Sequence, residues 1–107
     1  MAAGKIKYRV LVVSSGDKIR DYFSGLLPAD EYELVSHAHN AGEARRLLLS
    51  QCADIVIINA PLSDEFGTQL ALDLSDSIMG IMLVVKSEHF ERITHLVEDS
   101  GVLTVAR

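Results

Sequence analysis

Short apolar runs alternate with amphipathic stretches along this 107-residue chain, and this alternation limits the possible folds more than any other feature. The apolar runs predict strands at residues 8–13, 32–37, 54–58, 81–85 and 102–105. The stretches between them have helical spacing and predict one helix between Asp17 and Pro28, and further helices at 41–51, 68–76 and 88–98. Asn40 fits an N-cap of the helix at 41–51. Because strands that alternate with helices pair in parallel, the sequence predicts an α/β fold with helices on both faces of one sheet.

The character of each run predicts its place in the sheet. Residues 8–13, 54–58 and 81–85 are the most apolar, as expected of central strands, whereas residues 32–37 are more polar, as expected of an edge strand. This distribution fits a five-stranded flavodoxin-like sheet of order 2-1-3-4-5. That order usually ends in a fifth helix, which is missing from this chain. We therefore expect a partly bare face beside the first and fifth strands, either because the chain is a fragment or because a partner covers that face.

Length and composition predict a single soluble domain over residues 1–107. Hydrophobic residues make up 49% of the chain, but no run approaches the ~20 apolar residues of a membrane span. Cys52 is the single cysteine and the N-terminus lacks an apolar secretory segment, so we expect a cytoplasmic protein without membrane contact. The net charge of −5 argues against direct binding of DNA or RNA by these residues.

Polar side chains follow the predicted central strands. Asn59 comes directly after residues 54–58, Ser14 and Ser15 follow the first strand, and Lys86 follows the fourth. Ligands of open parallel sheets bind at the carboxyl ends of the strands, so these side chains mark the candidate site. An amide cannot act as a carboxylate nucleophile or carry charge to a metal. We therefore expect no catalytic residue and no enzyme activity.

Four landmarks occur in order along the chain: the apolar residues 10–13 followed by a turn, the strand and polar residue at 54–59, Gly67 eight residues beyond Asn59, and the turn at 100–102 before the last strand. With these landmarks the chain resembles the receiver domains of bacterial response regulators, the CheY-like family. The resemblance covers nearly the whole chain. It implies a role in two-component signal transduction, in which a phosphorelay ends on a receiver aspartate.

The resemblance also implies a functional pocket, and here that pocket is altered. Receivers of this family hold Mg²⁺ with two acids after the first strand and the acceptor aspartate after the third, and these positions match Ser14, Ser15 and Asn59. The family's hydroxyl position matches Lys86, and Ser87 follows it. The aromatic position matches Thr104, and the lysine position matches Arg107. The degenerate phosphoacceptor pocket thus comprises Ser14, Ser15, Asn59, Lys86, Ser87, Thr104 and Arg107. Since no acid remains, we expect a pseudo-receiver that needs no metal, no cofactor and no phosphorylation.

Residues 54–67 and 101–105 resemble a narrower group, the receiver-like domains that precede an RNA-binding antitermination (ANTAR) helical domain. This likeness implies the N-terminal part of a longer, often dimeric response regulator, which contacts RNA only through the absent effector. The family's working surface, the fourth helix with strands four and five, implies a protein partner or homodimer. Its exposed residues are expected to be Glu88, Glu91, Arg92, His95 and Glu98.

Several alternatives remain open on the sequence alone. The ammonium of Lys86 either lies in the vacated pocket or reaches solvent. Asp17 or Asp64 could replace the lost acids in a phosphorylation-competent receiver, although Asp17 also fits a helix cap, and Asp64 and Glu65 fit solvated residues that favour the start of the third helix. A third alternative is a flavodoxin-like site for a flavin or another small ligand.

His37 and His39 are two residues apart, so on a strand they would share a face. Such a pair can bind a metal ion, but it lacks the cysteine or acidic ligands of a closed zinc site, and we expect no metal. Cys52 lies between a predicted helix and a predicted strand without a base nearby in the sequence. We expect it to be a packed thiol rather than a nucleophile.

Overall fold

The computed structural model describes residues 6–107, in which five strands form one parallel sheet of order β2-β1-β3-β4-β5. The strands are β1 (Tyr8–Val13), β2 (Tyr32–Ala38), β3 (Ile55–Asn59), β4 (Gly80–Val85) and β5 (Leu103–Ala106). This result confirms the predicted flavodoxin-like order. Because every pair is parallel, the carboxyl ends of all five strands lie at the same edge of the sheet.

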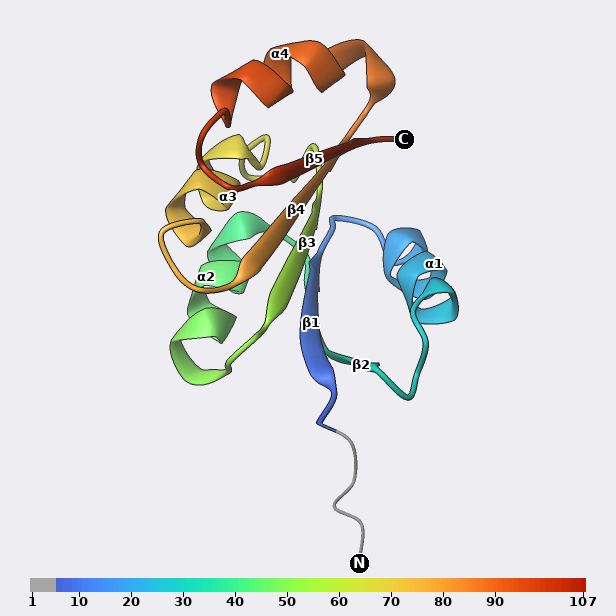
Figure 1. Cartoon of the computed structure of the whole chain (residues 1–107). Coiled ribbons are helices and arrows are strands. Elements are labelled where there is room, and N and C mark those ends of the chain that lie inside the picture. Colours follow the sequence, from blue (N-terminus) through green and yellow to red (C-terminus); the bar gives the residue numbers. More distant parts are fainter. Residues whose placement is uncertain (1–5) are drawn as a thin grey trace, which may run out of the picture.

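Helices cover the two faces of the sheet unequally. The helices are α1 (Lys18–Leu26), α2 (Ala41–Ser50), α3 (Thr68–Leu74) and α4 (Phe90–Leu96), with a 3₁₀ turn, η1 (Ser87–His89), before α4. Figure 1 shows α1 alone on one face and the other three helices on the opposite face. None of the helices within residues 6–107 is long and apolar enough to cross a membrane.

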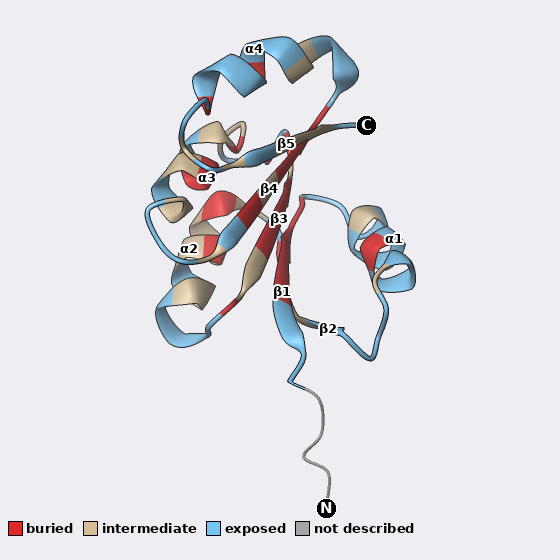
Figure 2. Ribbon diagram, viewed as in Figure 1, coloured by how far each residue is buried: buried red, intermediate tan, exposed pale blue. Residues whose placement is uncertain are grey.

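The core is centred on β1, β3 and β4, whose buried residues form the red bands of Figure 2. The larger of two apolar clusters lies between the sheet and α2, α3 and α4. Its largest fully buried side chains are Leu11, Ile58, Leu70, Leu83 and Ile93. The chain thus buries one face of its sheet thoroughly, which fixes the positions of the strand ends.

The opposite face is only partly covered, as the missing fifth helix led us to expect. Its cluster has fewer buried residues, namely Val10, Val12, Phe23, Ile57 and Val84. An apolar groove of about 480 Å³ lies between α1 and strands β4 and β5, and Tyr22 and Leu26 of α1 are exposed beside it. Leu103 of β5 is also exposed and pairs in register with Met82, which packs against this cluster.

Two helices differ from their predicted ranges at their ends. The third ends at Leu74 instead of residue 76, because the hydroxyls of Ser75 and Ser77 donate to the carbonyls of Leu72 and Leu74 and bond to the last turn. The predicted helix 88–98 begins with the tighter turn η1, and its α-helical part ends at Leu96. The change in the third helix comes from local hydrogen bonds, which the spacing of apolar residues does not predict.

Three predictions about single residues have different outcomes. Asn40 does cap α2, because its Oδ1 accepts from the Glu43 N–H at 2.8 Å. Asp17 occupies the N-cap position of α1, but its carboxylate makes no capping hydrogen bond. Cys52 is exposed, so the prediction of a packed thiol was wrong. The residue lies in the turn between α2 and β3, outside the core.

Candidate functional site

Side chains from the carboxyl ends of three strands line one cavity. Ser14 follows β1, Asn59 ends β3 and Arg107 follows β5. All three line a cavity of about 540 Å³, which the first residues of α1 complete. The other lining residues are Gly16, Asp17, Lys18, Ile19 and Tyr22. The structure therefore brings together three of the predicted pocket residues at the edge where the strand order predicts a site.

The guanidinium of Arg107 lies directly against Asn59. Its Nη1 donates to the Asn59 Oδ1 at 3.0 Å and to the Ala60 carbonyl at 2.7 Å, with a longer contact of 3.4 Å to the Val84 carbonyl. The backbone N–H of Arg107 donates to the Val85 carbonyl at 2.9 Å and anchors the residue beside β4. No ion pair described for residues 6–107 includes Arg107. Neutral oxygens therefore hold this positive charge in place.

Ser14 and Ser15 form the turn after β1 and supply no charge. Ser14 is only 1% exposed, and its Oγ accepts from the Gly16 N–H at 3.3 Å. Its backbone N–H donates to the Ala38 carbonyl at 2.9 Å, which ties the turn to β2. Ser15 is exposed. Because Mg²⁺ is held by anionic oxygen, these hydroxyls are poor replacements for a pair of acids.

Lys86 and Ser87 lie outside this arrangement. Lys86 is exposed at the start of η1, and no hydrogen bond or ion pair described for residues 6–107 involves its ammonium. Neither residue lines the cavity. Of the two interpretations of Lys86, the structure shows the one in which its side chain reaches solvent. The cation beside Asn59 is Arg107.

Thr104 is half-buried within β5 and does not line the cavity. It pairs in register with Leu83, so its side chain lies on the sheet face that α3 and α4 cover. The Oγ1 of Thr104 is the one buried side-chain polar atom within residues 6–107 that lacks a hydrogen-bond partner. An unsatisfied hydroxyl of this kind costs about 1–3 kcal/mol. Thr104 matches a pocket position of the family in the resemblance, but its side chain lies outside the cavity of Asn59.

Asp64 and Glu65 are structural residues of the loop after β3. Both carboxylate oxygens of Asp64 accept from the first N–H groups of α2, those of Ala41 and Gly42, at 2.9 Å. These two hydrogen bonds lower the pKa of the Asp64 carboxyl below its ordinary value. The expectation that Asp64 supports the third helix was wrong, because it caps α2. Glu65 does support that helix, since its Oε1 accepts from the Leu70 N–H at 2.9 Å.

The chain was compared with protein families, with curated proteins and with solved structures. No protein-family model matches the sequence, and no curated protein does. Solved structures do match. The signal receiver domain of an HD domain-containing protein from Pseudomonas fluorescens Pf-5 gives a TM-score of 0.74 at 20% identity over 94% of this chain and 81% of that chain. Response regulator protein TrrA from Thermotoga maritima, in complex with Mg²⁺ and BeF, gives a TM-score of 0.75 at 24% identity. The match covers 95% of this chain and 87% of that chain.

A CheY-like response regulator receiver domain protein from Methanospirillum hungatei JF-1 gives a TM-score of 0.72 at 19% identity, over 94% of this chain and 81% of that chain. The strand order β2-β1-β3-β4-β5 fits the flavodoxin-like fold of these receiver structures. This chain has the receiver fold.

The two acids that the sequence offered as alternative site residues, Asp17 and Asp64, both have other partners. Asp17 lines the cavity, but its Oδ1 lies 3.5 Å from the Nδ1 of His37 and 3.5 Å from the Nε2 of His39. Asp64 bonds to the start of α2 with both oxygens. Among the side-chain hydrogen bonds described for residues 6–107, Asn59 therefore has the Arg107 guanidinium as its partner, and no carboxylate.

Sequence reasoning included Arg107 in the receiver pocket but did not foresee its bond to Asn59. The available signal was the match of Arg107 to the family's lysine position. The two residues are 48 apart in sequence, so only the parallel pairing of β3, β4 and β5 brings them together.

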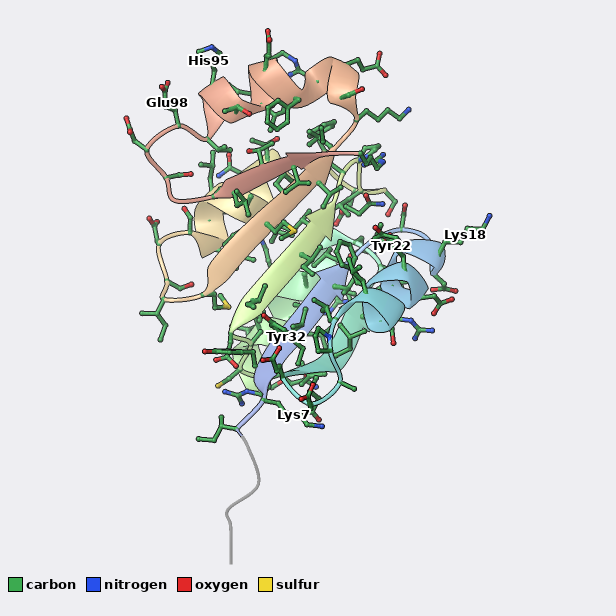
Figure 3. All side chains as sticks on the ribbon, turned by 45° about the vertical axis from the view of Figure 1, so that its right-hand side comes forward. Lys7, Lys18, Tyr22, Tyr32, His95 and Glu98 are labelled. Carbon is green, nitrogen blue, oxygen red and sulfur yellow. The ribbon has the colours of Figure 1, made fainter. Side chains whose placement is uncertain are left out.

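The outer face of the receiver fold along η1 and α4 presents polar side chains. The five residues predicted for this surface are all exposed, namely Glu88, Glu91, Arg92, His95 and Glu98. Figure 3 shows His95 and Glu98 projecting away from the sheet, and the His95 Nδ1 lies 3.7 Å from the Glu98 Oε2. Leu96 on the same helix is 55% exposed. This face thus combines charge with one large apolar side chain.

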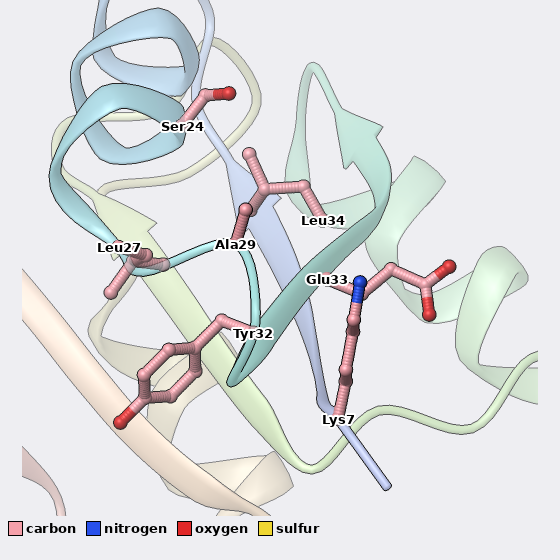
Figure 4. A pocket seen from close by; sticks show the side chains of 7 residues that line it. All are labelled: Lys7, Ser24, Leu27, Ala29, Tyr32, Glu33 and Leu34. Carbon is pink, nitrogen blue, oxygen red and sulfur yellow. The ribbon is translucent and has the colours of Figure 1, made fainter. Parts of the chain in front are cut away.

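Another cavity, of about 570 Å³, lies far from this chemistry (Figure 4). It opens where α1 ends and β2 begins, at the opposite edge of the receiver sheet. Its lining residues are Lys7, Ser24, Leu27, Ala29, Tyr32, Glu33 and Leu34. None of the predicted pocket residues lines it. We therefore assign the candidate site to the smaller cavity at Asn59, where strand ends converge.

Proposed function

We propose that this chain is a receiver-like regulatory domain of a response regulator that acts without catalysis and without phosphorylation. The observation that carries the proposal is the hydrogen bond of 3.0 Å from Arg107 to Asn59. An amide cannot form an acyl phosphate, and Mg²⁺ needs anionic oxygens that Ser14 and Asn59 do not offer. A protein with this site is suited to signal through its contacts rather than through its chemistry.

The guanidinium of Arg107 supports a domain that holds one conformation. Phosphorylation switches a protein by changing local charge near a bistable element. Here positive charge already lies against the residue that ends β3, and three backbone or amide oxygens hold it there. A permanent positive charge thus takes the place of the reversible charge change that phosphorylation would bring.

Titration with Mg²⁺ and beryllofluoride, an acyl-phosphate mimic, tests the proposal. Backbone amide shifts of the ¹⁵N-labelled chain are followed by NMR, first with Mg²⁺ alone and then with both. We expect no saturable shift at Ser14, Asn59 or Arg107, because no carboxylate is free to hold the metal. Saturable shifts there would contradict the proposal and favour a phosphorylation-competent receiver that uses a substitute acid.

A double variant provides the positive control. Ser15→Asp with Asn59→Asp adds two carboxylates at exposed or half-exposed positions and leaves the buried Ser14 unchanged. We expect this variant to gain saturable Mg²⁺ binding under the same conditions. The contrast between the two proteins shows that the assay detects a working pocket.

We further propose that the face formed by η1 and α4 contacts a protein partner or a second copy of the chain in the cytoplasm. The exposed charges and Leu96 support this assignment. The resemblance of residues 54–67 and 101–105 to domains that precede an antitermination effector supports control of an RNA-binding C-terminal domain. Gel-shift assays with structured RNA, on a chain that carries such an effector and on this domain alone, test that link. Binding by this acidic domain alone would contradict it.

A further inference from the structure

Three metal-ligating side chains converge beside the β1–α1 turn. Asp17 precedes α1, His37 lies on β2 and His39 follows that strand. One ligand atom from each lies within 4.8 Å of the other two, and this group is the one possible metal cluster found within residues 6–107. The two imidazole rings have centroids 4.3 Å apart. Sequence analysis noted the histidine pair but missed the acid, which comes from 20 residues earlier in the chain.

His37 is held in the tautomer that a metal requires. Its Nε2 lies 3.0 Å from the Ser14 carbonyl, and a carbonyl only accepts hydrogen bonds, so Nε2 carries the proton. The lone pair of the neutral ring is therefore on Nδ1, which lies 3.5 Å from the Asp17 Oδ1. The side chain is 7% exposed, so its orientation is fixed by packing. Metal-binding histidines are commonly oriented in this way by a backbone carbonyl.

His39 has a matching arrangement with a carboxylate. Its Nδ1 lies 3.4 Å from the Glu43 Oε1, and its Nε2 lies 3.5 Å from the Asp17 Oδ1. A proton on Nδ1 is directed at Glu43, and the lone pair on Nε2 is then directed at Asp17. Each histidine thus has an outer partner that accepts its N–H and an inner nitrogen that faces the same carboxylate oxygen.

The spacing of the inner atoms suits a shared cation. Two acceptors that face each other repel unless a proton or a metal ion lies between them. Ligands about 2.1 Å from a tetrahedral zinc ion are about 3.4 Å apart, and both nitrogen–oxygen separations here are 3.5 Å. A direct hydrogen bond between these groups would be shorter, at about 2.7–2.9 Å. Lys18, the nearest cation in sequence, extends away from the domain (Figure 3).

We propose that Asp17, His37 and His39 bind a divalent transition-metal ion of the zinc class, with Glu43 and the Ser14 carbonyl as outer partners. Imidazole nitrogen suits zinc and its neighbours, whereas Mg²⁺ and Ca²⁺ take oxygen ligands, so this site is chemically distinct from a receiver's magnesium pocket. Three protein ligands leave a fourth position for solvent or another ligand. Asp17 also lines the cavity of Asn59, so the ion lies next to the degenerate pocket.

Calorimetric titration of the chelator-treated chain with zinc chloride tests the site. We expect one zinc ion per chain. Asp17→Asn and His39→Ala should each weaken zinc binding by more than about 100-fold, which exceeds the loss of affinity caused by removing an outer partner. Glu43→Gln is expected to weaken binding by about tenfold. His39 is 53% exposed, so its substitution leaves the buried His37 and the core intact.

Two control variants separate this site from other zinc ligands. His95→Ala removes an exposed histidine that also faces a carboxylate, and Cys52→Ser removes the exposed thiol. Both are expected to bind zinc as the unmodified chain does. Cobalt(II) gives a second measurement, because tetrahedral coordination produces strong visible absorption, which Asp17→Asn and His39→Ala should abolish.

The proposal is overturned if the unmodified chain shows no saturable zinc binding, since the three side chains are then plain ion pairs. It is equally overturned if Asp17→Asn and His39→Ala bind zinc as tightly as the unmodified chain, or if His95→Ala or Cys52→Ser loses binding instead. The magnesium titration is a separate test, because it uses a different ion and follows the amide shifts of Ser14, Asn59 and Arg107.

Discussion

At the scale of single residues, the site is defined by which groups meet Asn59. The residue ends β3 at the edge where receivers carry out phosphoryl chemistry, yet its Oδ1 accepts from a guanidinium. Gly67, a landmark of the resemblance, has an equally physical reason. Its φ of +123° disfavours any side chain, and a Cβ there would lie 3.1 Å from the Ile58 Cγ2. Gly67 thus keeps a landmark of the receiver loop, whereas Asn59 is an amide at the position where the resemblance implies an acid.

Replacing Arg107→Ala tests the contact at this scale. The substitution removes hydrogen bonds to Asn59 and to two backbone carbonyls, so we expect the free energy of unfolding to fall by about 1 kcal/mol. The side-chain amide resonances of Asn59 should shift as well. Chemical denaturation and NMR measure the two effects.

Arg92→Ala is the matched control, because Arg92 is exposed on α4 and its one described contact is a long one of 3.4 Å to His89. We expect its stability to match that of the unmodified chain. Equal stability of the two variants, with unchanged Asn59 resonances, would show that Arg107 does not hold the amide.

At the scale of elements, the loop after β3 organises two helices at once. Asp64 accepts from the first N–H groups of α2, while Glu65 accepts from α3 and from Arg45 of α2 at 3.0 Å. Hydrogen bonds to Glu65 and then to Asp73 raise the pKa of Arg45, so the guanidinium stays charged throughout. The loop that borders the pocket is therefore held by α2 as well as by its own strand.

The capping role of Asp64 makes part of the stability depend on pH. Its pKa is lower in the folded chain than the ordinary value of about 3.9, so its contribution is present above about pH 4 and is lost as the pH falls through the folded pKa. We expect Asp64→Asn to be less stable than the unmodified chain at pH 7. The difference should shrink on acidification below about pH 4.

Denaturant titrations across that range measure this difference. Glu33→Gln, at an exposed position of β2, serves as the control. A difference between Asp64→Asn and the unmodified chain that stays constant from pH 7 to pH 3 would mean that the carboxylate charge is not what caps α2.

At the scale of the whole molecule, two surfaces remain open to partners. One is the apolar groove beside α1, over β4 and β5, and the other is the polar face of η1 and α4. The second surface includes Leu96, a large apolar side chain among charged neighbours. That combination of an apolar centre with a polar surround is typical of contacts between proteins.

If the face of α4 joins two copies of the chain, Leu96→Asp should shift the protein toward monomer. The new carboxylate would lie among Glu91 and Glu98 of both copies, where like charges repel. Sedimentation over a range of protein concentrations measures the change. Leu49→Asp is the matched control, because Leu49 is 88% exposed on α2, and it should sediment as the unmodified chain does. An unmodified chain that remains monomeric throughout would exclude the homodimer and leave a different protein as the partner.

The sequence by itself determined the α/β class, the strand order and the identity of Asn59 as the residue at the critical edge. It could do so because strand and helix periods are local properties, and because a run of Val and Ile at 55–58 needs cover on both faces wherever it lies. The same local signals located the cap at Asn40. They overestimated the range of α3, whose end depends on two serine hydroxyl contacts, and the α-helical range of α4.

Only the tertiary structure decided which charged groups meet. Asp17 turns to His37 and His39 instead of capping α1, Asp64 caps a helix 22 residues earlier, and Arg107 reaches Asn59 from 48 residues away. Long polar side chains have several partners within reach at each strand end, and no sequence period chooses among them. The parallel sheet makes the choice, because it brings the carboxyl ends of separate strands to one edge and fixes the distances there.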